Sequence, residues 1–157
     1  MDLKNNEIKE IYRSMKIMYV GIVLGVIGFF AITLYLNVVM LLSLTDDKDL
    51  KNILNMVSVL SMLSLIPLAF YLYKKKLSAI SSELPFIERI VLYKKTYLIK
   101  IVLLDACCFL CIGFFFISNN QYILYSVLIS IIALLMSYPN KTTLISDLKT
   151  ESENSVD

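Results

Sequence analysis

An aspartate and three cysteines are the side chains in the second half of the chain whose types are best suited to chemistry. Asp105 has the only charge between Lys100 and Lys141, and an ionisable group inside an apolar segment is a functional hypothesis by default. At matching depth on neighbouring segments we expect Tyr19, Ser137 and Tyr138. A hydrogen bond to one of these hydroxyls would make Asp105 structural. Two alternatives stay open, namely that Asp105 binds a proton or an ion, or that it contacts a partner subunit.

The three cysteines, Cys107, Cys108 and Cys111, form a CCxxC cluster close to Asp105. A structural zinc site takes four ligands, and its cysteines are thiolates. Charged thiolates are costly in hydrocarbon, and the chain has no His that would complete such a site. We therefore expect reduced cysteines that pack as small apolar side chains, with no metal and no cofactor.

Several classes of function lack the residues that they need. The absence of His removes Ser-His and Cys-His nucleophile pairs. The 4 glycines do not form a Gly-rich phosphate loop. Lys and Arg number 15 against 13 Asp and Glu, and a net charge of +2 is too small for nucleic-acid binding by bulk basicity. The sequence predicts a protein that is not an enzyme and has no nucleic-acid partner.

The elements that position these residues are long apolar runs. The chain is 58% hydrophobic, and uncharged runs extend from Ile17 to Thr45 and from Asn52 to Tyr73. A third run follows Lys100 and is interrupted by the polar stretch 118–121. Crossing the hydrocarbon takes about 20 helical residues. We predict an all-α fold, a four-transmembrane-helix bundle forming one membrane domain over residues 1–149, with an uncleaved first span. The expected spans are about 17–44, 52–73, 98–117 and 122–138, and the acidic tail 150–157 is expected to be disordered.

The distribution of Lys and Arg predicts the orientation of these spans. Thirteen of the 15 basic residues lie in the N-terminal segment, between spans two and three, or after span four. Because basic residues are enriched on the cytoplasmic side, we expect both termini to be cytoplasmic in a bacterial inner (plasma) membrane. The lipid bilayer is then the first partner of the chain.

The segment between spans two and three carries two apolar seams at helical spacing. Tyr73, Leu77, Ile80 and Leu84 repeat before Pro85, and Phe86, Ile90, Tyr93 and Tyr97 repeat after it. Proline disfavours helix at the preceding residue and suits the first turn of a new helix. The pattern predicts that spans two and three extend beyond the membrane as a cytoplasmic antiparallel helical hairpin. Its lysines serve either as anchors to anionic lipid or as a docking surface for an acidic partner.

Small residues mark two candidate helix-packing faces. Gly21, Gly25 and Gly28 share one face of the first span, and the first two form a GxxxG pair. The fourth span offers Ser126, Ser130 and Ala133 at similar spacing. Small residues allow close approach of helices in lipid. The two faces therefore pack against each other within one molecule, or the glycines form the seam of a homodimer.

The second half resembles a family of small, uncharacterised bacterial four-span integral membrane proteins. The resembling residues, roughly within 97–148, are Lys100-Ile-Val-Leu-Leu-Asp105 and the stretch from Tyr138-Pro139-Asn-Lys141 to Asp147-Leu148. In that family a basic residue precedes a Leu-Leu-acid step, and the fourth span ends in Arg-Pro-x-Lys. Here Tyr138 stands where the family has the Arg before proline. The resemblance implies a four-span fold and carries no known activity.

Two functional hypotheses follow from these apolar runs and the few polar groups within them. The first is a non-enzymatic membrane scaffold or accessory subunit that contacts a membrane-protein partner. The second is a small transporter or a proton- or ion-binding membrane subunit that uses Asp105.

Overall fold

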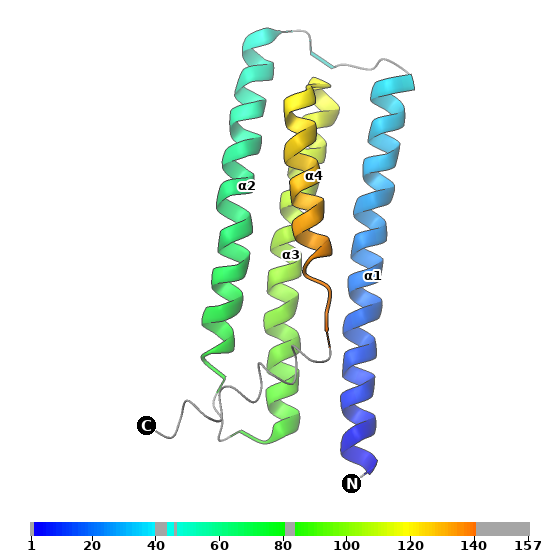
Figure 1. Cartoon of the computed structure of the whole chain (residues 1–157), viewed down its shortest axis with the longest axis vertical. Helices are drawn as coiled ribbons and strands as arrows, with labels where there is room; N and C mark the ends of the chain where they lie inside the picture. The colour runs from blue at the N-terminus through cyan, green and yellow to red at the C-terminus, as the bar shows by residue number, and fades with distance from the viewer. Residues whose placement is uncertain (1, 40–43, 46, 81–83, 141–157) are drawn as a thin grey trace.

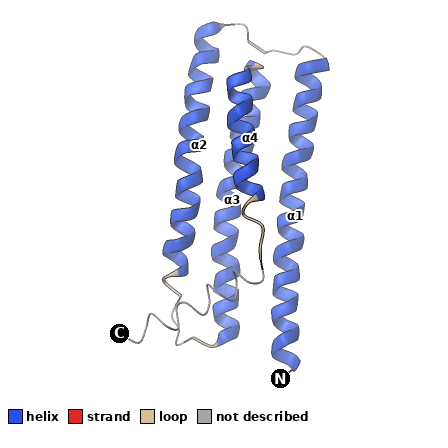
Figure 2. Ribbon diagram, viewed as in Figure 1, coloured by secondary structure: helices blue, strands red, loops and turns tan. Residues whose placement is uncertain are grey.

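The computed structural model describes residues 2–39, 44–45, 47–80 and 84–140 of the 157-residue chain. Within these ranges it contains four helices and no strand (Figures 1 and 2). The helices are α1 (Asp2–Val39), α2 (Lys48–Leu77), α3 (Phe86–Ser118) and α4 (Gln121–Leu135). The all-helical prediction is confirmed. The predicted tail 150–157 lies outside the described residues.

Three of these helices are long and apolar enough to cross a membrane, namely α1, α2 and α3. Helix α4 is apolar but has only 15 residues, which is about 22 Å at 1.5 Å per residue. It ends at Leu135 rather than near residue 138, where the sequence suggested that the fourth span would end. From Met136 the chain continues in turn and coil to Asn140.

Local side chains set the ends of the helices. The Asp47 carboxylate accepts a hydrogen bond from the backbone N–H of Asp49 at 2.9 Å, which caps the start of α2. Helix α3 ends at Ser118, and the left-handed backbone of the next residue, Asn119 (φ 46°), reverses the chain. The side chain of Asn120 then caps α4 by accepting from the N–H of Tyr122 at 3.0 Å. Two adjacent asparagines thus join α3 and α4 in a tight turn.

Helix α3 is the centre of the bundle. It packs against α1, α2 and α4, and it has the largest buried share of the three long helices. Its inward face includes Ile101, Leu104, Ile112 and the three cysteines, all fully buried. Helices α1 and α2 lie on the outside (Figure 1), and much of their apolar surface is exposed.

Helices α1 and α3 run parallel with a constant offset in residue number. The Lys94 ammonium donates to the Ser14 hydroxyl at 2.9 Å, and the rings of Phe29 and Phe109 lie 5.3 Å apart. Both pairs are separated by 80 residues in sequence, so the two helices keep one register over this length. The register places Gly25 at the level of Asp105.

The two ends of the bundle differ in charge. Helix α1 begins, α2 ends and α3 begins at the same end (Figure 1). The described lysines and arginines of this end are Lys9, Arg13, Lys16, Lys74, Lys75, Lys76, Arg89, Lys94 and Lys95. We call it the basic end. The opposite end, where Asp47, Asn119 and Asn120 lie, is the turn end.

Candidate functional site

Three tyrosines converge on the point where α4 stops. The Tyr19 hydroxyl of α1 donates to the carbonyl oxygens of Leu134 and Leu135, at 3.1 and 3.0 Å. The last four carbonyls of a helix have no intrahelical partner, and leaving them unpaired in an apolar interior costs free energy. Tyr19 therefore acts as a side-chain cap that one helix supplies to another.

The other two tyrosines continue this pattern along the chain after α4. Tyr97 of α3 donates to the carbonyl of Ser137 at 2.9 Å, and Tyr12 of α1 donates to the carbonyl of Pro139 at 3.1 Å. Irregular backbone is tolerated at membrane depth only where protein or a cavity surrounds it. The hydroxyls of Tyr97 and Tyr12 supply hydrogen-bond donors to this irregular backbone.

Pro139 explains why α4 stops where it does. A proline has no N–H, so it cannot donate the helical hydrogen bond to Leu135, four residues earlier, and it disfavours helix at Tyr138. The carbonyl of Leu135 instead accepts from the Tyr19 hydroxyl and, at 3.3 Å, from the N–H of Tyr138. The Ser137 hydroxyl turns back to the carbonyl of Ala133 at 3.0 Å. Local sequence ends the helix, and a distant helix adds a second donor to its last carbonyls.

A small polar cavity lies beside this segment. It has a volume of about 130 Å³. Helix α2 contributes Tyr73, helix α3 contributes Tyr93, Tyr97 and Lys100, and the chain after α4 contributes residues 136–140. The Tyr73 hydroxyl donates to the Tyr93 hydroxyl at 3.0 Å, and their rings meet edge to face. We call this the Lys100 cavity.

Aromatic rings hold the ammonium of Lys100 on the wall of this cavity. The Lys100 nitrogen lies 4.8 Å from the ring centres of Phe70 and Tyr73, and 6.0 Å from that of Tyr97. A cation over ring faces is attracted by the ring quadrupole. The arrangement fixes a positive charge between α2 and α3 close to the end of α4.

The hydroxyls that we expected beside Asp105 bond to other groups in the structure. Tyr19, Ser137 and Tyr138 do come together: Tyr19 and Ser137 bond to α4 carbonyls, and the Tyr19 and Tyr138 rings meet edge to face at 5.4 Å. No described residue gives a hydrogen bond to the enclosed Oδ1 of Asp105. Asp105 itself is partly buried, one helical turn before Phe109, whose ring meets that of Phe29 on α1.

The cysteines lie where α2, α3 and α4 meet. All three are free thiols and fully buried. The Ser58 hydroxyl of α2 donates to the Cys111 sulfur at 3.5 Å, and the Ser130 hydroxyl of α4 lies 3.5 Å from the Cys107 sulfur. Within the described part of the chain, no group of three His, Cys, Asp or Glu side chains is placed to hold a metal ion.

The two small-residue faces do not meet each other. Gly21, Gly25 and Gly28 are exposed, and a Cβ added at any of them would have no neighbour within 4 Å. Ser126 and Ser130 are buried and Ala133 is partly buried, on a helix that packs mainly against α3 and α2. The glycine face of α1 therefore points out of the bundle, and a seam between two copies stays a prediction.

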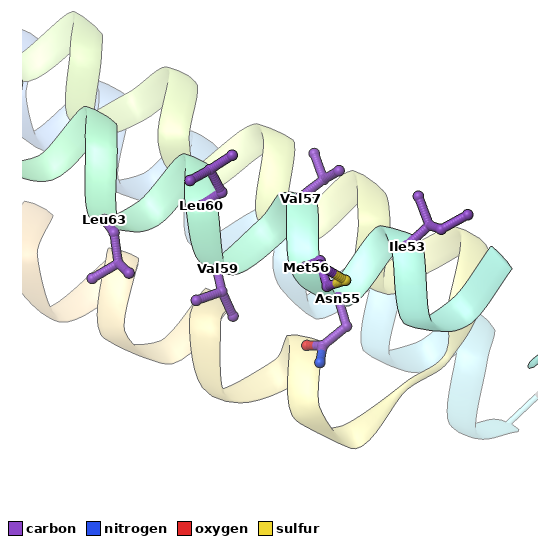
Figure 3. A pocket seen from close by; sticks show the side chains of 7 residues that line it. All are labelled: Ile53, Asn55, Met56, Val57, Val59, Leu60 and Leu63. Atoms are coloured by element: carbon purple, nitrogen blue, oxygen red, sulfur yellow. The ribbon is translucent and has the colours of Figure 1, made fainter. Parts of the chain in front are cut away.

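An apolar groove follows the outer face of α2 (Figure 3). It has a volume of about 590 Å³ and is lined by Ile53, Asn55, Met56, Val57, Val59, Leu60 and Leu63. Met56, Leu60 and Leu63 are among the most exposed apolar side chains of the chain. In a bilayer this is the surface that lipid tails would cover. The Oδ1 atom of Asn55 is enclosed, and no described group bonds to it.

Sequence reasoning missed the tyrosine cap and the Lys100 cavity. The spacing of Tyr73, Tyr93 and Tyr97 indicated only the hairpin seams, and Lys100 served only as a basic residue, as the start of an apolar run and as part of the resemblance. The available signal was the concentration of Tyr and Lys near the ends of apolar runs, which is typical of membrane interfaces.

Comparison with known proteins adds no further constraint, because no family model, no curated protein and no solved structure matches the chain.

Proposed function

We propose that the protein is a four-span, non-enzymatic integral membrane protein of a bacterial inner (plasma) membrane, acting as a scaffold or accessory subunit. Support for membrane insertion comes from α1, α2 and α3, each long and apolar enough to cross. The basic end predicts the cytoplasmic side, with both termini there.

The fourth crossing combines α4 with the chain that follows it. Helix α4 covers about 22 Å of about 30 Å of hydrocarbon. Residues 136–140 continue from it as turn and coil, and their carbonyls receive the hydroxyls of Tyr97 and Tyr12. Because the end of the helix and the irregular backbone are both hydrogen-bonded, this segment is able to complete the crossing.

The hairpin between α2 and α3 is the proposed cytoplasmic surface. Helix α3 has 33 residues, about 50 Å at 1.5 Å each, against about 30 Å of hydrocarbon. With Ser118 at the outer boundary, the basic end of α3 projects by roughly 20 Å. Lys94 and Lys95 lie on this part.

The observation that carries the scaffold proposal is how the interior hydroxyls are used. Tyr19, Tyr97 and Ser137 donate to main-chain carbonyls at or after the end of α4, and Ser130 donates to the carbonyl of Ser126 at 2.8 Å. The Tyr19 and Tyr97 bonds join different helices to the end of α4, and the two serine bonds stay within α4 and its last turn. Such a polar interior supports a structural role, and it leaves the outward glycine face of α1 as the surface where another membrane helix can approach closely.

Association tests this proposal. Gly25→Leu places a large side chain in open space, so it blocks a partner helix without a clash inside the molecule. Extracted from native membranes in mild detergent, the parent is expected to migrate in native electrophoresis as part of a larger complex, and Gly25→Leu as a smaller species. Ala31→Leu, at another exposed small residue of α1, is the control. Migration of the parent as a single chain would contradict the accessory role.

A proton- or ion-binding subunit is the second candidate, favoured by the enclosed Oδ1 atom of Asp105. A carboxylate oxygen without a described hydrogen-bond donor retains the capacity to take a proton or a cation. Melting midpoints of the parent and of Asp105→Asn, measured across pH and with added cations, test this role. Identical profiles for the two proteins would eliminate it.

A further inference from the structure

Asp105 lies well inside the proposed hydrocarbon region. It is 13 residues from Ser118 along α3, about 20 Å at 1.5 Å per residue. With Ser118 at the outer boundary of about 30 Å of hydrocarbon, roughly 10 Å separate Asp105 from the boundary at the basic end. An ionised side chain at this depth is costly unless it is paired. This step rests on the membrane placement proposed above.

The interior of the bundle does not supply the pairing group. The Oδ1 atom of Asp105 is enclosed, and no described residue gives it a hydrogen bond. Lys100 is the nearest cation along α3, but its five-residue separation turns it about 140° round the helix axis. The Lys100 ammonium lies over the rings of Phe70 and Tyr73 on α2. The group that neutralises Asp105 is therefore expected to come from outside the molecule.

An open surface lies at the level of this carboxyl group. The register of α1 and α3 places Gly25 at the level of Asp105, and one turn further the exposed rings of Phe29 and Phe109 lie 5.3 Å apart. Gly21 and Gly25 are exposed, and a Cβ added at either would have no neighbour within 4 Å. Asp105 also keeps exposed surface. We call these five residues the Asp105 face.

A transmembrane helix suits the Asp105 face better than lipid does. Lipid tails carry neither a charge nor a hydrogen-bond donor, and the nearer headgroups lie roughly 10 Å from Asp105. A helix can approach closely where glycines leave open space, and one of its side chains can reach the carboxylate.

The charge of Asp105 indicates the kind of helix. Ionisable residues within membranes almost always pair with one another or with backbone carbonyls, so Lys or Arg at the same depth is the complementary group. A second copy of this chain inserts with the same orientation and brings another Asp105, a like charge, to this depth. A bare metal ion finds one carboxylate and, among the described residues, no group of three His, Cys, Asp or Glu to hold it.

We propose that the Asp105 face binds a transmembrane helix of a partner protein that carries a lysine or arginine at the depth of Asp105. The partner's cation pairs with the Asp105 carboxylate, and its backbone packs over Gly21 and Gly25. This proposal rests on the accessory role proposed above and names the chemistry of the partner.

Synthetic transmembrane peptides test the proposal without a change in the Asp105 face. Each probe is a leucine/alanine helix of about 22 residues, with lysine, leucine, glutamine or glutamate at one position about 10 Å inside one end. The full chain carries an acceptor dye at Tyr122→Cys, an exposed position, because the native cysteines are buried. Energy transfer from donor-labelled peptide in phosphatidylcholine vesicles measures the association of each peptide.

The lysine peptide is expected to associate at least about tenfold more tightly than the leucine or glutamine peptide, the effect of one charge-assisted hydrogen bond. The glutamate peptide is expected to bind least, because it brings a like charge. Equal association of the lysine and leucine peptides would overturn the proposal. A glutamine peptide as tight as the lysine peptide would also overturn it, because this would show a hydrogen bond to a protonated acid.

Variants of the protein locate the effect. Asp105→Asn is nearly isosteric and is expected to reduce association of the lysine peptide to that of the leucine peptide. Glu88→Gln removes the same charge from an exposed position of α3 and is the matched control. Gly25→Leu is expected to weaken binding of the lysine peptide, and Ala31→Leu to leave it unchanged. Equal losses in Asp105→Asn and Glu88→Gln would contradict the assignment to Asp105.

Native complexes separate this proposal from the accessory role itself. A complex lost in Gly25→Leu but retained in Asp105→Asn would support the accessory role and contradict the ion pair. Energy transfer between two labelled copies without peptide, abolished in Asp105→Asn, would identify a second copy as the occupant and overturn the proposal. Resistance of the parent to alkaline extraction from membranes tests membrane insertion separately.

Discussion

At the scale of single residues, tyrosine hydroxyls from other helices donate to the carbonyls at the end of α4, which residues next to the helix end more commonly do. Tyr19, Tyr97 and Tyr12 belong to α1 and α3, yet their hydrogen bonds end on carbonyls at or after the end of α4. A phenol combines an apolar ring with a polar tip. It can therefore pass between apolar helices and still deliver a donor to a buried carbonyl.

Removing the Tyr19 hydroxyl tests this role. Tyr19→Phe keeps the ring but removes the hydroxyl that donates to the carbonyls of Leu134 and Leu135, which then keep only the N–H groups of Ser137 and Tyr138. We expect a loss of about 1 kcal/mol in the free energy of unfolding, the net contribution of one hydrogen bond, measured as a lower melting midpoint in detergent. Tyr35→Phe, at an exposed tyrosine of the same helix, is the control and should have little effect. Equal midpoints for the parent and Tyr19→Phe would exclude the cap.

Asp105 calls for a different expectation. Its Oδ1 atom is enclosed and receives no hydrogen bond from a described residue, while Tyr19 and Ser137 bond to backbone carbonyls. Asp105→Leu would thus leave neither hydroxyl without a partner. If the residue is not used for ion binding, this apolar substitution should maintain or increase the melting midpoint, because burying an unpaired polar atom costs about 1–3 kcal/mol. A marked decrease would reveal a partner for the carboxylate.

At the scale of elements, the turn between α3 and α4 depends on one backbone conformation. Asn119 has a positive φ of 46°, which residues other than Gly and Asn adopt at a cost. Its side chain also donates to the carbonyl of Asn37 at 3.4 Å, a long contact. The turn directs α4 back along α3 and so brings its end to the tyrosines.

Two substitutions separate these contributions at Asn119. Asn119→Gly removes the side chain but keeps the conformation accessible, and it should have a small effect. Asn119→Ala should destabilise the protein by about 1 kcal/mol more than Asn119→Gly, because an alanine Cβ disfavours positive φ. Thermal melts of the two variants under identical conditions measure the difference. If alanine were as stable as glycine, the backbone argument would fail.

At the scale of the whole molecule, the charge asymmetry predicts orientation. The basic end carries Lys95 on an exposed position, and the turn end carries the exposed Tyr122. Single cysteines at these positions can be labelled selectively, since the native cysteines are buried. A membrane-impermeant maleimide should label Tyr122→Cys in intact spheroplasts and Lys95→Cys only in inside-out vesicles. The reverse pattern would invert the proposed topology.

The sequence by itself determined the class of element and its approximate position. Uncharged runs, the polar stretch 118–121 and the prolines Pro85 and Pro139 act on their own neighbourhood, because helix formation and termination depend on local hydrogen bonding and sterics. The lack of His likewise excluded Ser-His and Cys-His nucleophile pairs from the composition alone. These inferences needed no knowledge of which helices are neighbours.

Only the tertiary structure decided which face of each helix turns inward. In an apolar span, residues that face lipid and residues that face the core are equally apolar, so the pattern of hydrophobicity does not tell them apart. This is why Gly21, Gly25 and Gly28 could be grouped on one face of α1 from the sequence, although their outward direction could not be inferred. The same reason explains why Tyr19 and Lys100 were visible as residues while their partners, on helices distant in sequence, were not.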